Sequence, residues 1–158
     1  VRKSVQARLR PTTFGWHNIR CPGLVAQEEI VFRDDARRYE AGTANWLGLV
    51  GLHAALELLL EIGIDAIAAD LLRKRRWLVP ALQAKGCTVL HADAPPPNSS
   101  AIVTFSRDGT DMTAVHERLL EAKIITSLRT DRAGRRYVRF SPHFYNTDAE
   151  LLRAVELV

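Results

Sequence analysis

The sequence predicts an α+β fold: a sheet of about four strands with helices on one face, preceded by a long buried helix and an irregular N-terminal strip. Of its 158 residues, 47% are hydrophobic and 25% are charged, which is typical of a folded globular protein. From residue 64 onward, hydrophobic periodicity indicates the order helix, strand, strand, helix, strand, strand, helix. This order favours a compact sheet covered by helices.

Residues 1–42 form the strip with little regular periodicity. Turn-forming glycines and prolines interrupt it, and few apolar runs occur between them. Because long stretches without secondary structure are uncommon in a free-standing domain, we expect this strip to pack on a surface outside itself.

Residues 45–62 predict a helix that is apolar nearly all round. Its leucines, with Trp46 and Val50, leave no broad polar face. Gly63 follows as a C-terminal stop. We therefore expect the helix to be buried on most sides.

A second helix is expected from an N-cap at Asp65 to about Lys85, bent at Pro80. Short β-branched runs at 87–91 and 101–106 then indicate two strands joined by a proline-rich loop. Helical spacing returns over 110–122.

The C-terminal third predicts two more strands, a hairpin-like turn and a last helix. The strands cover 124–129 and 136–140, and the run 130–135 has the composition of a turn. Thr147 and Glu150 have the spacing of a capping box at the start of the last helix.

Charge and cysteine content exclude several classes of protein. The net charge of +4 is spread among interleaved acids, which argues against a polyanion-binding role. Cys21 and Cys87 lack disulfide or metal spacing, and so do the five histidines, so no metal site is expected. No run approaches the ~20 apolar residues that span a bilayer. A cytoplasmic protein with reduced thiols, no membrane contact and no nucleic-acid partner is expected.

The first candidate site is Thr43, near the entrance of the helix at 45–62. Free main-chain N–H groups and the positive end of the helix dipole favour an anion such as phosphate there. The alternative is that Thr43 or Asn45 only caps the helix.

The second candidate site is Arg139, on the predicted strand 136–140. Strand alternation places Val138 and Phe140 on one face and Tyr137 and Arg139 on the other. An arginine held on a rigid strand suits bidentate recognition of a carboxylate. Arg129 ends the neighbouring strand and could join it. The alternative is that both are merely exposed strand arginines.

A basic cluster at 73–76 precedes Trp77. It could contact nucleic acid through charge and stacking, but a solvated helix face is the favoured interpretation.

Several of these motifs, in the same order, are similar to the class V aminotransferase family of fold-type I pyridoxal-phosphate (PLP) enzymes. That family includes cysteine desulfurases, selenocysteine lyases, isopenicillin-N epimerase-like proteins and kynureninases. The motifs are Gly15-Trp16, the run 38–43, the helix ending at Gly63, and the run 139–147.

The resemblance implies a remnant of the large PLP-binding domain at 1–44, a connecting helix at 45–63 and the C-terminal small domain at 64–158. It also implies a homodimer in which Thr43 contacts the cofactor phosphate of the neighbouring subunit. Arg139 would hold the α-carboxylate of an amino-acid substrate, and Arg129 would lie near the substrate entrance.

Two departures from the family pattern limit the expected chemistry. The family's Schiff-base lysine would precede Val1, and Lys3 is no substitute, so we expect no catalytic residue here, no covalent PLP binding and no activity of the chain alone. The run 130–135 lacks the desulfurase cysteine, which disfavours the persulfide route and leaves transamination, epimerisation or another lyase reaction. The alternative is a non-catalytic dimerisation or polyanion-binding domain.

Overall fold

The computed structural model describes residues 1–20 and 29–158, which form two compact units. The first unit covers Val1–Glu57 and the second covers Leu58–Val158. Cys21, one of the two cysteines, lies outside the described residues.

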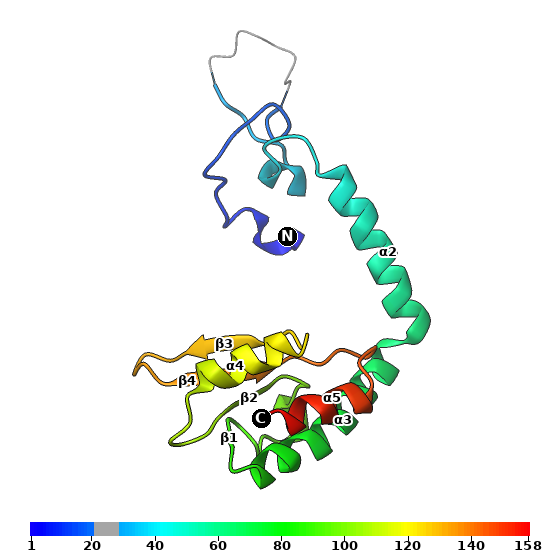
Figure 1. Cartoon of the computed structure of the whole chain (residues 1–158). Helices are drawn as coiled ribbons and strands as arrows, with labels where there is room; N and C mark the ends of the chain where they lie inside the picture. The colour runs from blue at the N-terminus through cyan, green and yellow to red at the C-terminus, as the bar shows by residue number, and fades with distance from the viewer. Residues whose placement is uncertain (21–28) are drawn as a thin grey trace. The chain divides into compact units, whose positions relative to one another are not determined.

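The first unit is mostly irregular, as predicted for the N-terminal strip. Its regular elements are the short helix α1 (Lys3–Gln6), the 3-10 turn η1 (Ala36–Tyr39) and the start of helix α2 (Trp46–Ile62) (Figure 1). Among its described residues, one isolated antiparallel bridge pairs Ile19 with Phe32. Main-chain hydrogen bonds outside regular secondary structure, such as that from Arg33 N to Asn18 O at 3.0 Å, also join parts of the strip.

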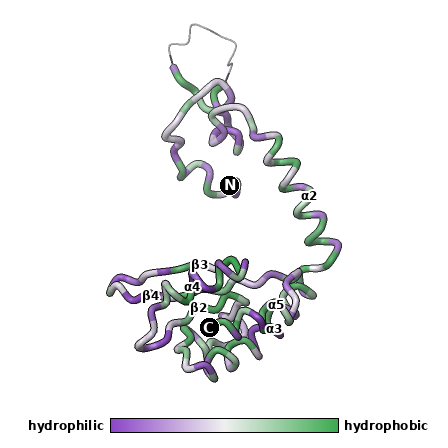
Figure 2. The backbone as a smooth tube through the Cα atoms, viewed as in Figure 1, coloured by the Kyte–Doolittle hydropathy of each residue, from purple (hydrophilic) through white to green (hydrophobic). Residues whose placement is uncertain are grey.

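Helix α2 forms where predicted, but its predicted burial is wrong for the described chain. None of its residues is buried, and Leu47 is 88% exposed. Hydrophobic residues follow one another along most of its length (Figure 2). Because they point in every direction around the axis, only a layer on several sides could cover them, and the described residues supply no such layer. Gly63 ends the helix with a φ of +91°, a conformation that glycine adopts without strain.

The second unit is the predicted α+β domain. Its elements are α3 (Ile64–Ala84), β1 (Thr88–Val89), η2 (Pro96–Asn98), β2 (Val103–Ser106), α4 (Met112–Glu121), β3 (Ser127–Thr130), β4 (Arg136–Phe140) and α5 (Asp148–Glu156). The four strands form one antiparallel sheet in the order β1-β2-β4-β3.

One face of this sheet carries the core. Phe105 and Val138 are fully buried from β2 and β4, and they join a single cluster with Leu82 of α3, Leu119 of α4 and Val155 of α5. Helices from three parts of the chain therefore cover the same face, as predicted (Figure 1).

Some boundaries differ from the prediction. Asp65 lies in the first turn of α3, and the N-cap is Gly63, because the chain turns directly from α2 into the next helix. β1 is only two residues long, since His91 adopts a φ of +51° that leaves the extended region. Pro80 lies inside α3, as predicted.

The C-terminal elements follow their local signals closely. β4 has the predicted bounds, and β3 begins three residues later than expected. Gly134 (φ +82°) closes the hairpin, and its N–H donates to Asp131 O at 3.1 Å. Thr147 and Glu150 form the predicted capping box of α5.

Candidate functional site

The candidate residues fall into two groups, one in each unit. The first surrounds the segment that leads into α2, and the second lies on the sheet face opposite the core. Each group is described by itself.

In the first unit, the turn at Gly15 packs against the segment before Thr43. A Cβ on Gly15 would lie 2.2 Å from Ala41 O, so only glycine permits this approach. The main-chain N–H of His17 also points to Ala41 O, at 3.4 Å. The two sequence motifs of this region therefore lie side by side.

Asn18 holds these segments together, a role that the sequence analysis missed. Its side chain is 1% exposed, accepts from Gly15 N at 2.9 Å, and donates to Thr13 O at 3.0 Å and Arg38 O at 3.1 Å. An asparagine satisfies one donor and two acceptors with a single amide. No local motif marks it, because Arg38 is twenty residues away.

Thr43 is exposed and lies outside any helix or strand, just before α2. Asn45 caps the helix: its Oδ1 accepts from Gly48 N at 3.0 Å and its carbonyl accepts from Leu49 N at 2.9 Å. Within the described residues, the hydroxyl and main-chain N–H of Thr43 make no hydrogen bond.

Two further polar atoms of the first unit are buried without a partner among the described residues: Arg38 Nε and His17 Nδ1. Buried donors and acceptors are normally satisfied, so such atoms point to a group beyond the described residues. The free hydroxyl and main-chain N–H of Thr43, just before α2, are donors of the kind that can bind an anionic phosphate such as that of PLP.

In the second unit, the sheet carries a polar face opposite the core. It is formed by Thr104, Ser127, Arg129, Tyr137 and Arg139. Register places Arg139 directly between Thr104 and Ser127, and pairs Arg129 with Tyr137. Arg129 and Arg139 are thus diagonal neighbours on adjacent strands, a geometry in which the Cα atoms lie roughly 7–8 Å apart. The predicted alternation is confirmed, since Val138 and Phe140 are buried.

Arg139 is half-buried and poorly satisfied. Its Nη2 donates to Ser127 Oγ at 3.4 Å, which is long for a hydrogen bond, and its Nε is buried without a partner among the described residues. The side chain of Arg129 is exposed and makes no hydrogen bond or ion pair in the described part of the chain. The face therefore presents two guanidinium groups with donors to spare.

Nearby, Tyr137 donates its hydroxyl to Asp131 at 3.0 Å. This hydrogen bond to the carboxylate raises the pKa of Tyr137. Tyr137 is therefore engaged with the hairpin turn.

The segment after Arg139 contains an aromatic cluster. His143 stacks on Tyr145 with ring centroids 4.7 Å apart and an interplanar angle of 25°, and it also contacts Phe144. His143 Nδ1 is buried and has no partner among residues 1–20 and 29–158.

The interpretation of the basic cluster at 73–76 as a solvated helix face is wrong for two of its four members. Lys74 and Arg75 are buried. Arg75 donates to the carbonyls of His91, Ser100 and Ile102 at 2.6–3.3 Å.

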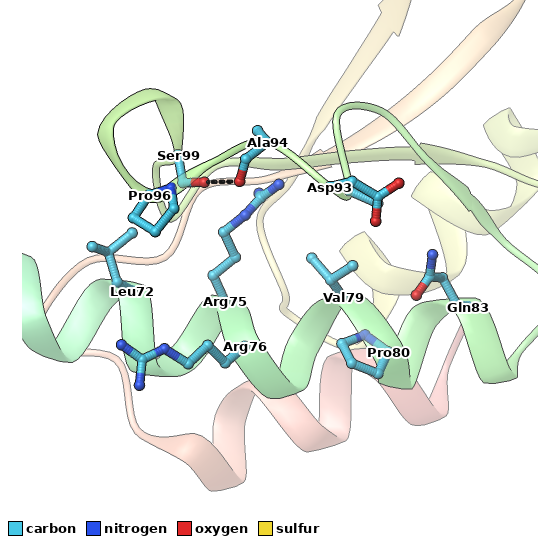
Figure 3. A pocket seen from close by; sticks show the side chains of 11 residues that line it. Leu72, Arg75, Arg76, Val79, Pro80, Gln83, Asp93, Ala94, Pro96 and Ser99 are labelled. Atoms are coloured by element: carbon cyan, nitrogen blue, oxygen red, sulfur yellow. Dashed lines mark hydrogen bonds between the residues drawn. The ribbon is translucent and has the colours of Figure 1, made fainter.

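These hydrogen bonds hold the guanidinium of Arg75 beside a cavity of about 330 Å³, which lies between α3 and the loop at 92–99 (Figure 3). Arg73 is likewise engaged, in an ion pair with Asp148 at 2.8 Å. Little of the cluster's charge is therefore free for a nucleic acid.

The described residues contain neither a cluster of potential metal ligands nor a single helix that could span a membrane. No group of three or more potential ligands gathers there. No single helix is long and apolar enough to cross a membrane, although α2 and α3 pass that test jointly as a pair bent by 76°.

Comparison with known proteins defines the class. The model of the family "Aminotransferase class-V" matches residues 1–153. A cysteine desulfurase of Synechococcus elongatus is 34% identical over 146 residues, covering 80% of this chain and 21% of the relative. A probable cysteine desulfurase of Xylella fastidiosa is 34% identical over 86 residues, 54% of this chain and 20% of the relative.

Solved structures share the fold. A cysteine desulfurase from Thermococcus onnurineus matches 99% of this chain and 40% of its own with a TM-score of 0.86 at 19% identity. CsdA of Escherichia coli matches 99% and 39% with a TM-score of 0.82 at 20% identity. C-DES, solved with glycine covalently linked to its PLP cofactor, reaches 0.78 at 23% identity, over 99% of this chain and 39% of its own.

The architecture is thus the fold of part of these solved chains. The chain belongs to the class V aminotransferase family. It spans about a fifth of the length of the curated relatives and about 40% of the similar solved chains.

Proposed function

We propose that this chain is the C-terminal part of a PLP-dependent class V enzyme acting on an amino acid. In this proposal Arg139 binds the substrate α-carboxylate, Arg129 assists at the entrance, and Thr43 contacts the cofactor phosphate. The proposed organisation is a large-domain strip at 1–44, a connecting helix at 45–63 and a small domain at 64–158.

One observation carries the proposal: Arg139 is fixed on a central strand with a buried Nε that has no described partner. A guanidinium whose donors are unmet suits a planar carboxylate, which can accept two parallel hydrogen bonds. Holding the carboxylate would orient the bonds at the α-carbon, a positioning contribution to catalysis. PLP, when bound, supplies the electron sink for chemistry at that carbon.

The chain's own lysines support the expectation that it does not bind PLP covalently. Lys74 is buried in an ion pair with Asp70, and Lys85 Nζ donates to Glu156 O at 3.1 Å. Lys3 and Lys123 lie exposed on α1 and on the turn after α4. We therefore propose that the Schiff-base lysine and the activity belong to a longer protein.

The reaction proposed is transamination, epimerisation or a lyase step that uses no cysteine of the hairpin turn. The turn at 131–134 contains no cysteine, and Cys87 lies in the core, where burial raises the pKa of its thiol. A buried thiol with a raised pKa is a poor nucleophile.

We also propose a cytoplasmic homodimer in which Thr43 serves the neighbouring subunit. The exposed apolar surface of α2 supports association. The buried thiol of Cys87, which is not in a disulfide, is consistent with a reducing compartment.

The carboxylate assignment is tested by NMR titration of the chain with L-alanine, using L-alaninol as a ligand that lacks the carboxylate. We expect L-alanine alone to shift the Arg139 Nε–H signal. Arg139→Gln should weaken its binding by about tenfold or more, the usual effect of losing charge-assisted hydrogen bonds. Arg132→Gln, in the exposed turn, is the matched control. Equal binding by wild type and Arg139→Gln would contradict the assignment.

The cofactor assignment has its own test. The chain is incubated with PLP, reduced with borohydride and mapped by mass spectrometry. We expect no lysine to be modified selectively. Selective modification of any one of the four lysines would show that the chain carries a Schiff-base lysine.

A further inference from the structure

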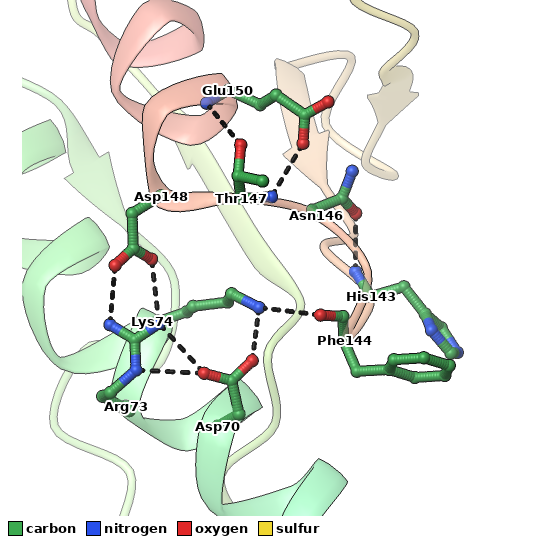
Figure 4. Close-up of polar contacts among 9 residues, drawn as sticks. All are labelled: Asp70, Arg73, Lys74, His143, Phe144, Asn146, Thr147, Asp148 and Glu150. Carbon is green, nitrogen blue, oxygen red and sulfur yellow. Dashed lines mark hydrogen bonds and ion pairs between the residues drawn. The ribbon is translucent and has the colours of Figure 1, made fainter. Parts of the chain in front are cut away.

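Lys74 is a buried lysine that reaches from α3 to the segment following Arg139. Its side chain is 3% exposed, is paired with Asp70 one helical turn earlier, and donates from Nζ to Phe144 O at 3.2 Å (Figure 4). The hydrogen bond from Lys74 lowers the pKa of Asp70. Because a buried ammonium needs both a counter-charge and hydrogen bonds, its position is narrowly defined.

The segment that receives this contact, residues 141–146, has no helix or strand of its own. Internally it is closed by His143 N donating to Asn146 Oδ1 at 2.8 Å and by Asn146 N donating to His143 O at 3.1 Å. Lys74 joins the middle of this segment to α3 through Phe144 O, while Asn146, at the end of the segment, hydrogen-bonds to Glu150 of α5. The middle of the segment is therefore tied to α3 through Lys74.

α3 also binds the start of α5, just beyond the same segment. Arg73 donates to both oxygens of Asp148, in the first turn of α5, at 2.8 and 2.9 Å (Figure 4). At the near end, Phe140 is buried in the core and fixes β4 directly after Arg139. Adjacent residues of α3 thus bind the middle of the segment and its exit.

We propose that Lys74, charge-balanced by Asp70, is a positioning residue that fixes segment 141–146 and through it the carboxylate site at Arg139. This inference rests on the function proposed for Arg139. Lys74 touches no substrate in this arrangement. It sets the path of the backbone that continues from the arginine and carries the aromatic cluster of His143.

The test substitutes Lys74 and leaves Asp70 in place. Asp70 is partly exposed and keeps Arg73, which it shares with Asp148, as an ion-pair partner at 2.9 Å, so Lys74→Met leaves no buried carboxylate without a partner. Removing Asp70 would instead leave the buried ammonium unpaired and confuse positioning with unfolding. Arg76→Met, on an exposed arginine of the same helix, is the control, and Lys74→Arg tests rescue.

Amide hydrogen exchange at His143 and Asn146 measures the order of the segment. We expect Lys74→Met to accelerate it about tenfold or more while core amides of α3 and β4 change much less, since local opening is independent of global unfolding. In the same variants, affinity for L-alanine should fall with Lys74→Met and return with Lys74→Arg at unchanged thermal stability. A purely structural role would not produce that pattern.

The two possible failures are distinguishable. If exchange at His143 and Asn146 rises no more in Lys74→Met than in Arg76→Met, the positioning role is wrong and the function proposed for Arg139 is untouched. If wild-type chain gives no response to L-alanine at Arg139, the function proposed for Arg139 fails, and the role of Lys74 in carboxylate binding fails with it.

Discussion

Replacing Asn18 with alanine is expected to separate the segments that build the Thr43 region. The substitution removes three hydrogen bonds, to Gly15 N, Thr13 O and Arg38 O. Each is worth about 1 kcal/mol net. Thr13 is exposed, so water can replace its bond, whereas Gly15 and Arg38 are half-buried. The expected cost is roughly 2–3 kcal/mol, borne by the first unit.

Hydrogen exchange of the Gly15 and His17 amides measures this cost. At about 1.4 kcal/mol per tenfold change, exchange should accelerate roughly 30- to 150-fold. Asn98→Ala, on an exposed asparagine whose side chain makes no hydrogen bond in the described structure, should leave both amides unchanged. An acceleration below about threefold in Asn18→Ala would refute the role given to this side chain, since it corresponds to less than one net hydrogen bond.

Three further results are expected. Gly15→Ala should expose residues 1–57 to proteolysis, because the new Cβ would lie 2.2 Å from Ala41 O. Gly42→Ala, which has open space around it, should not. Equal protease resistance of the two variants would contradict this prediction. Thr147→Ala should lower the free energy of unfolding in urea by about 1 kcal/mol through loss of the capping box, and an unchanged midpoint would count against it. The hydrogen bond from Arg73 lowers the pKa of Asp148 in the folded protein. The stabilisation that this ion pair gives to the fold is therefore present above the ordinary aspartate pKa, and it is lost as the pH falls through the lower pKa of the folded protein. Asp148→Asn should therefore flatten the fall in stability below about pH 4; identical acid unfolding curves would exclude it.

Local signals in the sequence predicted the second unit well. The alternation around Val138 and the spacing of Thr147 with Glu150 each reflect interactions within a few residues, and both appear as expected. Helix and strand order followed for the same reason, since periodicity determines which face can be buried.

Contacts distant in sequence were not predictable in this way. Asn18 bonds to a residue twenty positions away, and Lys74 to one seventy positions away. Both are polar residues whose role depends on which carbonyl the fold brings close. Four adjacent basic residues on a helix usually point to water, which is why the sequence favours a solvated face at 73–76. The burial of Lys74 depends on two partners, the carboxylate of Asp70 one turn earlier and the remote carbonyl of Phe144.

Helix α2 leads to the last prediction, that the chain self-associates through its apolar surface. Leu47 and Leu60 are 88% and 71% exposed there, far more than a stable surface helix usually leaves uncovered along its length. Burying each leucine contributes about 1.5–3 kcal/mol. The double substitution Leu47→Glu and Leu60→Glu should therefore lower the association constant by about tenfold or more in sedimentation velocity over a concentration series.

Ile125→Glu is the matched control for this experiment, because Ile125 is equally exposed but lies outside α2. It should associate as the wild type does. If the α2 variant and the control weaken association equally, the association reflects general hydrophobic contact. If the wild type remains monomeric at its solubility limit, α2 is not an interface. Because the helix is apolar nearly all round, apart from the side that carries His53 and Glu57, one flat contact cannot cover it. A homodimer through α2 would therefore leave part of the helix exposed in this chain, and dimers are expected to associate further at high concentration; dimers that do not associate further would show that the helix is covered in another way.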